Sequence, residues 1–392
     1  MNKALLFLTL LGLALPAWST DALPVATVQE FQAVDARGLG AFAERVRQHE
    51  PVIIGFLGGS ITLGSGASVS GKCYRELTGK ALIQEIQSRG GRAKTVHAAI
   101  GGTTSTFGAY RVEAQLLVKK PDLLVVEFAV NDQAAPTLEG MEGIVRQALA
   151  QNPKMGIVFL YTANAQGVKD AYDQGRITDA VAAHHRVARH YGIMEVLAGP
   201  VVSAGVKAGT YTLAEFLPDG THPSDLGHAC YAQLLTKALV AALDQPVPGG
   251  SPTLPPLLGT GRLARARLTP PVAESDSDAA WTVKPDQWNW YGVPILVSSQ
   301  AGKTLHIRPP EGEDLALIFL GTLRLQWRTK TGVDMERTIT GKFGLPFPAT
   351  QTFPVGDIPD ATGLRIEALP GDKSVVNGQV WGFRSVQPLG RD

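Results

Sequence analysis

Short apolar runs alternate with longer amphipathic stretches between about Val52 and Leu243, and this alternation constrains the fold more than any other feature of the 392-residue chain. The runs contain only single polar residues, at His97, Glu127 and Glu195, as is typical of strands buried on both faces. Strands that alternate with helices predict a parallel sheet covered by helices on both faces. Because crossovers are right-handed, we expect the strand order 2-1-3-4-5. The runs are Val52–Leu57, Val96–Ile100, Leu123–Val130, Gly156–Tyr161 and Ile193–Leu197.

The composition changes after the last helical stretch. Residues 245–261 are crowded with Pro and Gly, as is typical of a linker between domains. Beyond them helical periodicity disappears, and short apolar runs separated by turn residues predict an all-β sandwich over residues 262–392. We therefore expect an α/β domain over residues 20–244, a linker and an accessory β-sandwich domain.

The first 19 residues have the features of a signal peptide. Lys3 precedes an apolar run from Ala4 to about Leu15, and Ala17 and Ser19 are the small residues that a signal peptidase reads. The run is too short to span a bilayer comfortably, and no later segment approaches about 18 uninterrupted apolar residues. We expect the mature chain to lack a membrane span and to be periplasmic or secreted.

Charge and cysteine content argue against several classes of protein. Lys and Arg number 36 and Asp and Glu 35, a balance unlike that of a nucleic-acid binder, which needs a basic surface. Two cysteines, Cys73 and Cys230, are too few for a four-cysteine zinc site or an iron–sulfur centre. They lie near the starts of predicted helices that can be neighbours, so a disulfide and two separate thiols both remain open.

Two short motifs carry the residue types of nucleophilic catalysis. The first apolar run leads into Gly58-Gly59-Ser60, at the carboxyl end of a strand, where open α/β sheets bind their ligands. Far downstream, Asp219-Gly220-Thr221-His222 places a carboxylate three residues before an imidazole. A serine nucleophile needs a base to take its proton, and the base needs a carboxylate to fix its tautomer. Each motif alone is also compatible with an ordinary turn.

Two further strand ends supply hydrogen-bond donors. Gly102 follows the second apolar run, and Asn131-Asp132 follows the third. In the order 2-1-3, both of these strands flank the strand that delivers Ser60. A developing oxyanion needs preorganised donors about 3 Å away, which two backbone amides and the Asn131 side chain would provide. Taken separately, Gly102 could lie in a plain turn and Asn131 could cap a helix.

These four blocks, in this order, resemble those of the SGNH hydrolase superfamily, the GDSL-type esterases, over roughly residues 50–243. The resemblance implies a flavodoxin-like three-layer α/β/α fold with a parallel five-stranded sheet. It also implies that Ser60 is the nucleophile, His222 the base and Asp219 the residue that orients the base.

The same resemblance implies an oxyanion hole formed by Ser60, Gly102 and Asn131. One position departs from the family, whose usual Gly-Asp-Ser is Gly-Gly-Ser here, with Gly59 in the Asp position. That Asp is not one of the catalytic groups, so the change leaves the implied chemistry intact and makes the substrate the more open question.

The expected function is that of an exported serine esterase that removes small acyl groups, chiefly O-acetyl, from a carbohydrate. The signal peptide, the appended β domain with its clustered Trp residues and the resemblance to a family rich in carbohydrate deacetylases favour a sugar. This chemistry needs no metal and no organic cofactor. The same triad would also serve a lipase, thioesterase or arylesterase, or an O-acyltransferase. A catalytically silent carbohydrate-binding protein is the alternative from another class.

Aromatic residues in the β domain raise a second question. Trp288 and Trp290 are candidates for stacking on sugar rings, with burial in the core as an equal alternative. Trp327 lies in an alternating strand, and we expect it in the core.

Histidines elsewhere in the chain favour no metal site. His184, His185 and His190 lie in a predicted helix beside arginines, and we expect them on its solvated face. They do not form a His-x-x-x-His zinc pair with a nearby Glu.

Overall fold

The computed structural model of the chain describes most residues between 37 and 386. The predicted signal peptide (1–19), residues 245–253 of the predicted linker, Trp288 and Trp290 lie outside the described residues. The described ranges are 37–132, 134–244, 254–284, 295–310, 313–329, 331–341, 351–354, 363–370 and 378–386.

A five-stranded sheet in the order β2-β1-β3-β4-β5 forms the centre of the α/β region, which confirms the predicted order. Strands β1, β3, β4 and β5 pair in parallel, and β3 and β4 are buried along their whole length. The strands are β1 (Pro51–Gly58), β2 (Arg92–Ala99), β3 (Leu123–Glu127), β4 (Gly156–Tyr161) and β5 (Met194–Leu197).

The edge strand β2 differs most from its expected bounds. The apolar run Val96–Ile100 marked only its end, because β2 begins at Arg92 and its first residues are exposed or half-buried. An edge strand has a neighbour on one side only, so polar residues are tolerated there and apolar content no longer marks the start of the strand.

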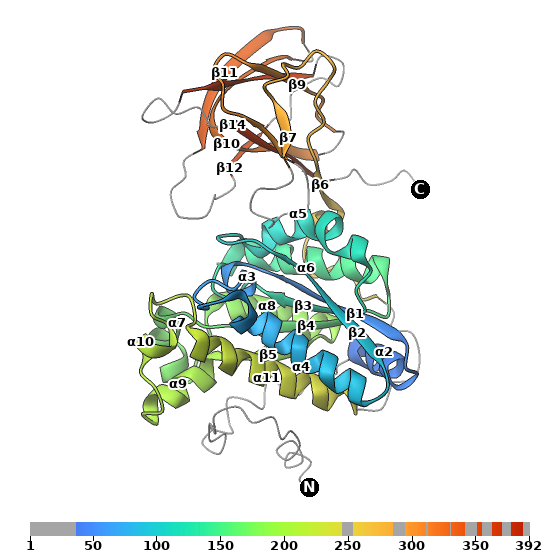
Figure 1. The fold of residues 1–392 in the computed structure, drawn as a ribbon, viewed down its shortest axis with the longest axis vertical. Coiled ribbons are helices and arrows are strands. Elements are labelled where there is room, and N and C mark those ends of the chain that lie inside the picture. The colour runs from blue at the N-terminus through green and yellow to red at the C-terminus, as the bar shows by residue number, and fades with distance from the viewer. Residues whose placement is uncertain are drawn as a thin grey trace. The chain divides into compact units, whose positions relative to one another are not determined.

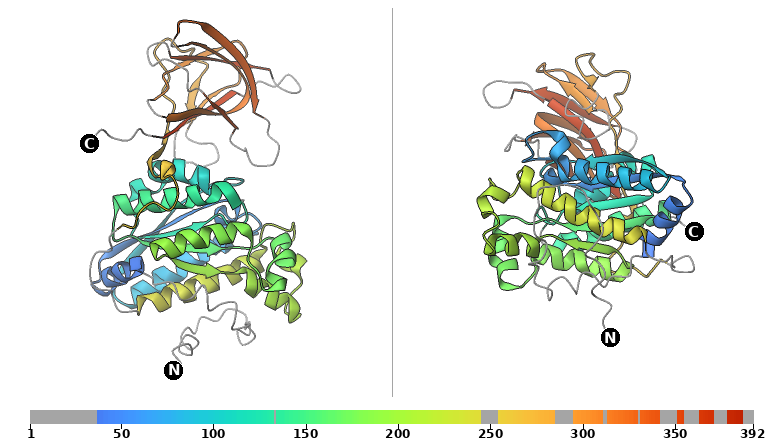
Figure 2. Two further views of the ribbon diagram at one scale, coloured as in Figure 1. Left: turned by 180° about the vertical axis from the view of Figure 1, so that it is seen from behind. Right: turned by 60° about the horizontal axis from the view of Figure 1, so that its bottom comes forward.

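Helices cover both faces of the sheet. On one face α4 and α11 lie side by side (Figure 1), which confirms that the two cysteine-bearing helices are neighbours. Val158 and Leu160 of β4 join the core on that face, whereas Phe159 and Tyr161 contact His184 of α8 on the opposite face (Figure 2). The helices are α2 (Arg37–Arg47), α3 (Ser60–Leu63), α4 (Tyr74–Ser88), α5 (Ser105–Gln115), α6 (Ala134–Gln151), α7 (Ala165–Asp170), α8 (Asp179–Tyr191), α9 (Gly199–Lys207), α10 (Leu213–Phe216) and α11 (Asp225–Leu243).

Among the described residues, α11 alone is long and apolar enough to cross a membrane, and more than half of that stretch is buried, as in the core helix of a folded domain. Cys73 and Cys230 are both free thiols. Burial raises the pKa of Cys230 to about 12, so this thiol is not a reactive thiolate at neutral pH.

The C-terminal region consists of antiparallel β-sheets, as predicted. Its longest strand, β10, pairs through its first half with β12 and β14 and through its second half with β11 and β13. The strands are β6 (Ala266–Thr269), β7 (Thr282–Lys284), β8 (Ile295–Ser298), β9 (Thr304–Ile307), β10 (Glu313–Arg328), β11 (Asp334–Gly341), β12 (Gln351–Pro354), β13 (Leu364–Leu369) and β14 (Gly378–Val386).

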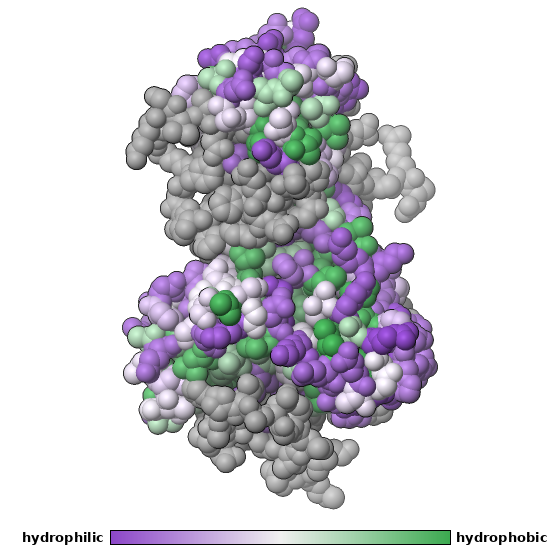
Figure 3. Space-filling view, viewed as in Figure 1, coloured by the Kyte–Doolittle hydropathy of each residue, from purple (hydrophilic) through white to green (hydrophobic). Residues whose placement is uncertain are grey.

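The sheets share an apolar core of their own that includes Leu317, Leu323 and Ile366. Trp327 packs against this core, as expected, and Trp281 is buried in it and donates from Nε1 to the backbone oxygen of Lys303 at 2.9 Å. Where exposed large apolar side chains occur on the described surface, they are scattered, and the face in Figure 3 mixes polar and apolar residues.

Contacts divide the chain into two compact units, and the second unit contains more than the β-sheets. It holds Gly259–Asp392 together with Ala98–Lys119 and Glu139–Ala148 from the α/β region. Within this unit α5 packs against β6, and Gln147 donates to the backbone oxygens of Ala109 and Leu263 at 2.8 and 2.9 Å. These contacts explain the grouping, and the predicted domain boundaries at 244 and 262 stay a prediction.

Candidate active site

Ser60 lies where β1 gives way to a short helix. It is the first residue of α3 and is 4% exposed. Gly58, just before this turn, has no room for a side chain, because a Cβ there would lie 2.0 Å from Thr62 Oγ1 and 2.7 Å from the Glu127 backbone oxygen. The glycine therefore lets α3 fold back against the end of β3, which presents the Ser60 side chain at the carboxyl edge of the sheet.

Ser60, His222 and Asp219 form a continuous chain of hydrogen-bonding contacts. Ser60 Oγ lies 2.9 Å from His222 Nε2, and His222 Nδ1 lies 2.6 Å from Asp219 Oδ2. With the proton on Nδ1 donated to the carboxylate, Nε2 presents its lone pair to the Ser60 hydroxyl. The sequence analysis placed Ser60 at a strand end and Asp219 and His222 in one motif far downstream, and the structure brings the three together.

A tight turn fixes the carboxylate. Asp219 Oδ1 accepts hydrogen bonds from the backbone amides of Thr221 and His222 at 2.9 and 2.7 Å, while Oδ2 faces the ring. Partial burial raises the pKa of Asp219, but the hydrogen bonds from the backbone and ring of His222 and from Thr221 outweigh it and lower the pKa to about 2. Asp219 is therefore ionised at neutral pH, as a residue that stabilises an imidazolium must be.

The loop after α3 packs closely against the loop that carries His222. At Gly66 a Cβ would lie 2.3 Å from the Pro223 backbone oxygen, so only glycine permits this approach. Asp225, at the start of α11, accepts from the amide and hydroxyl of Ser68 and pairs with Lys72 Nζ at 2.6 Å. These contacts bind the two loops together and so support the Ser60–His222 distance.

A buried carboxylate lies beneath Ser60. Glu127 ends β3, pairs in register with Gly58 and accepts hydrogen bonds from Thr62 Oγ1 at 3.0 Å and Thr162 Oγ1 at 2.7 Å. Burial raises the pKa of Glu127 to about 7, against a lowering by these two hydroxyls. In the sequence Glu127 was noticed only as a polar residue in an apolar run. The structure shows that it joins the ends of β1, β3 and β4.

The two remaining oxyanion candidates lie in turns after their strands. Asn131 follows β3, its backbone amide donates to Phe128 O at 3.0 Å, and its Oδ1 is buried without a hydrogen-bond partner in the described part of the chain. Gly102 follows β2, is exposed and has a φ of +69°. That the Ser60 and Gly102 amides and the Asn131 carboxamide act on one oxyanion stays a prediction.

One expectation about the histidines is wrong. His184 does not lie on a solvated face, because its side chain is 1% exposed and its Nε2 lies 2.9 Å from Asp132 Oδ2. The arginines nearby in the sequence favoured a solvated face, but the partner of His184 lies in the turn after β3 and so is distant in the sequence. His185 is half-buried against Glu195, and His190 donates to the Pro256 backbone oxygen. Across the described residues, no group of three or more His, Cys, Asp or Glu side chains could hold a metal ion.

The strand order and the Ser–His–Asp contacts together define the class of an α/β serine acylhydrolase. Residues 56–230 match the model of the GDSL-like Lipase/Acylhydrolase family. No curated protein matches the chain by sequence.

Solved structures resemble the chain over nearly its whole length. A two-domain esterase (CEX) active on acetylated mannans is 22% identical, with a TM-score of 0.70 over 92% of this chain and 98% of its own. The same kind of esterase co-crystallised with mannopentaose gives a TM-score of 0.68 at 22% identity, over 91% and 96% of the two chains. At this identity the likeness shows the shared two-part fold.

Proposed function

We propose that this chain is a serine esterase that hydrolyses O-acetyl esters on a carbohydrate. The single observation that carries the proposal is the contact chain from Ser60 Oγ through His222 to an ionised Asp219. The two-domain esterases of similar fold, which act on acetylated mannans, support a polysaccharide substrate. The predicted signal peptide adds export to the proposal, since cell-wall polysaccharides lie outside the cytoplasm.

The reaction divides into two steps. His222 Nε2 takes the Ser60 proton while Oγ attacks the ester carbonyl, and the C–O bond of the sugar ester then breaks as the imidazolium returns the proton to the sugar oxygen. Water, deprotonated by His222, attacks the acetyl-Ser60 ester and releases acetate and free Ser60. Asn131 and the two backbone amides would stabilise the oxyanion in both steps.

The experiment is an acetate-release assay on acetylated mannan, acetylated xylan and acetylated peptidoglycan. We expect release from at least one neutral polysaccharide and none with Ser60→Ala. Labelling by a fluorophosphonate probe measures Ser60 reactivity independently of the substrate. Labelling without acetate release, together with faster cleavage of decanoyl than acetyl p-nitrophenyl esters, would favour a lipase. Absence of labelling would favour a binding protein.

A further inference from the structure

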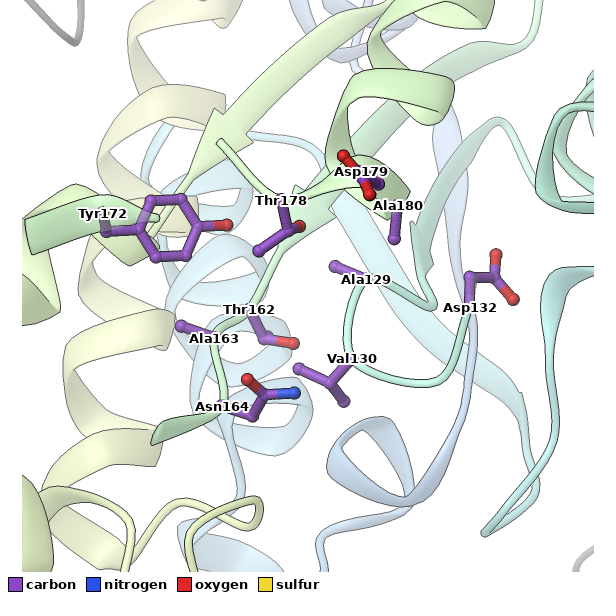
Figure 4. Close-up of a pocket in the computed structure, with 10 residues that line it drawn as sticks. All are labelled: Ala129, Val130, Asp132, Thr162, Ala163, Asn164, Tyr172, Thr178, Asp179 and Ala180. Atoms are coloured by element: carbon purple, nitrogen blue, oxygen red, sulfur yellow. The ribbon is translucent and has the colours of Figure 1, made fainter. Parts of the chain in front are cut away.

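We propose that a pocket beside the candidate active site binds one ring of a neutral sugar, an inference that rests on the esterase function proposed above. The pocket has a volume of about 270 Å³ and lies between the turn after β3, the loop after β4 and the start of α8 (Figure 4). This volume lies at the small end of ligand pockets, so it suits a single ring and not a long acyl chain.

The position of the pocket links it to the reacting groups. Ala129 and Val130, which line it, immediately precede Asn131. On the other side Asn164 precedes Ala165, whose amide donates to the Gly220 backbone oxygen at 2.8 Å, within the turn that holds Asp219 and His222. A ring in this pocket would therefore lie next to both the oxyanion candidate and the triad turn.

A buried hydroxyl in the pocket lacks a well-formed hydrogen bond. Tyr172 is 5% exposed, and its hydroxyl interacts with the Thr178 side chain but forms no hydrogen bond of standard geometry with any described residue. Figure 4 shows this hydroxyl pointing toward Thr178 and into the pocket. The ring cannot turn away, since it packs on Gly199, where a Cβ would lie 2.2 Å from the ring carbons. A buried hydroxyl proton without an acceptor is costly, so a ligand oxygen is its natural partner.

The other polar groups add donors at fixed positions. Asn164 Oδ1 accepts from the Gly167 amide at 2.7 Å, and Thr178 Oγ1 accepts from the Val181 amide at 3.4 Å. Asn164 Nδ2 is left to donate to a ligand. The Thr178 hydroxyl interacts with the phenol oxygen of Tyr172, which leaves the Tyr172 proton to donate. Burial raises the pKa of Tyr172 to about 12, so its phenol also stays a donor at neutral pH.

The charge of the lining favours a neutral ring. None of the described residues that line the pocket is Lys, Arg or His, whereas two of them, Asp132 and Asp179, are carboxylates. A carboxylated sugar would meet these side chains without a compensating cation in the pocket, whereas the hydroxyls of a neutral sugar match the Tyr172 and Asn164 donors and a carboxylate acceptor. Val130 supplies an apolar wall for the C–H face of the ring.

A second depression continues from the first. Its volume is about 380 Å³, and it shares Asn164, Thr178 and Asp179 with the first pocket while adding Gln166 and Arg176. Because the same side chains line both, a second ring of an oligosaccharide could follow the first. We therefore expect oligosaccharides to bind more tightly than monosaccharides.

The test compares Tyr172→Phe with a matched control, Tyr211→Phe. Tyr211 is equally buried, but its hydroxyl donates to the Val201 backbone oxygen away from the pocket. In a Ser60→Ala background, calorimetry with unacetylated manno-, xylo- and galacturono-oligosaccharides measures binding without turnover. Loss of one ligand hydrogen bond should weaken binding of a neutral oligosaccharide about three- to tenfold for Tyr172→Phe and leave Tyr211→Phe unchanged.

Turnover with Ser60 in place separates this inference from the esterase proposal. Tyr172→Phe should raise KM for an acetylated oligosaccharide by a similar factor and leave kcat/KM for p-nitrophenyl acetate unchanged, since that ester has no sugar ring. Ala180→Leu, which narrows the pocket, should have the same selective effect. Sugar binding that depends on Tyr172 without any ester hydrolysis would sustain this inference and refute the proposed function. Ester hydrolysis without binding of neutral oligosaccharides, or equal losses on both esters, would overturn the inference alone.

Discussion

Two Asp–His pairs lie near the carboxyl edge of the sheet, and their difference shows what a proton relay requires. In the Asp219–His222 pair the side chains are 57% and 23% exposed, and the second ring nitrogen lies 2.9 Å from Ser60 Oγ. In the Asp132–His184 pair both side chains are 1% exposed, and the ring lies against Phe159 and Tyr161. The two carboxylate–imidazole distances are similar, at 2.6 and 2.9 Å. Exposure to solvent and a hydroxyl at the second ring nitrogen therefore distinguish a catalytic Asp–His pair from a structural one. The carboxylate–imidazole contact alone does not.

The most direct test of this distinction is to remove the imidazole of each pair separately. His222→Ala should lower kcat for p-nitrophenyl acetate by about 10⁴- to 10⁶-fold, as loss of a triad member does in serine hydrolases. The reason is that no other group takes the Ser60 proton. His184→Ala, measured per folded molecule, should keep most of the activity, and circular dichroism verifies folding. Comparable losses of turnover in the two folded variants would show that the distinction is wrong.

Replacing the carboxylate of the exposed pair should have the next largest effect. Asp219→Asn keeps the shape of the turn but favours the wrong imidazole tautomer, so kcat should fall about 10³- to 10⁴-fold. The folded pKa of Asp219 is about 2, below its unfolded value, so its contribution is present above the unfolded pKa and is lost as pH falls toward 2. A kcat profile between pH 5 and 8 should therefore show no titration of Asp219. A loss of only a few-fold for Asp219→Asn would remove this residue from the triad.

The Asp132–His184 pair should contribute to the free energy of unfolding. His184→Ala leaves the Asp132 carboxylate buried without its partner imidazole, which typically costs about 3–5 kcal/mol of unfolding free energy. Urea unfolding followed by far-UV circular dichroism, which reports the helices of the α/β region, measures the loss. His222→Ala is the matched control, and because its ring is more exposed we expect a clearly smaller change. If both variants unfold at the same urea concentration, the Asp132–His184 pair does not stabilise the fold.

Sequence distance explains why one pair was predicted and the other missed. Asp219 and His222 are three residues apart, and both occur in one motif that a reader of the sequence meets at once. Asp132 and His184 are 52 residues apart and meet only because the turn after β3 faces α8. The strand order followed from alternation and handedness, which are local rules. Glu127 and Tyr172 were missed for the same reason as His184, since their polar surroundings come from other loops.

Asn131 directly precedes Asp132 of the buried pair. Replacing Asn131 tests whether this turn contributes to catalysis as well as to stability. Asn131→Ala should lower kcat by about 10²- to 10³-fold if the carboxamide donates to the oxyanion. KM should change little, because the interaction strengthens in the transition state. Steady-state kinetics on p-nitrophenyl acetate measure both parameters. Asn131→Asp has a similar shape and no side-chain donor, so full activity in that variant would exclude the carboxamide from the oxyanion hole.

Glu127 sharpens the comparison, because it is a buried carboxylate whose partners are two threonine hydroxyls and the Ala129 amide, with no imidazole among them. Its folded pKa of about 7 exceeds the unfolded value, so its stabilising contribution is fully present below the unfolded pKa and is lost as pH rises through 7. Asp132, Tyr74 and Tyr231 are the titratable groups coupled to it electrostatically.

The corresponding variant is Glu127→Gln, which keeps the shape and cannot ionise. The wild-type chain should lose up to about 3 kcal/mol of unfolding free energy between pH 5 and 8 through this group, and Glu127→Gln should lose correspondingly less. Urea unfolding of both proteins at pH 5, 6, 7 and 8 gives the pH dependence of each unfolding free energy. Groups other than Glu127 titrate in both proteins, so their contributions largely cancel when the two are compared. Equal slopes would mean that Glu127 keeps its charge in the folded protein. Two threonine hydroxyls and the Ala129 amide would then be enough to keep a buried carboxylate ionised without an imidazole.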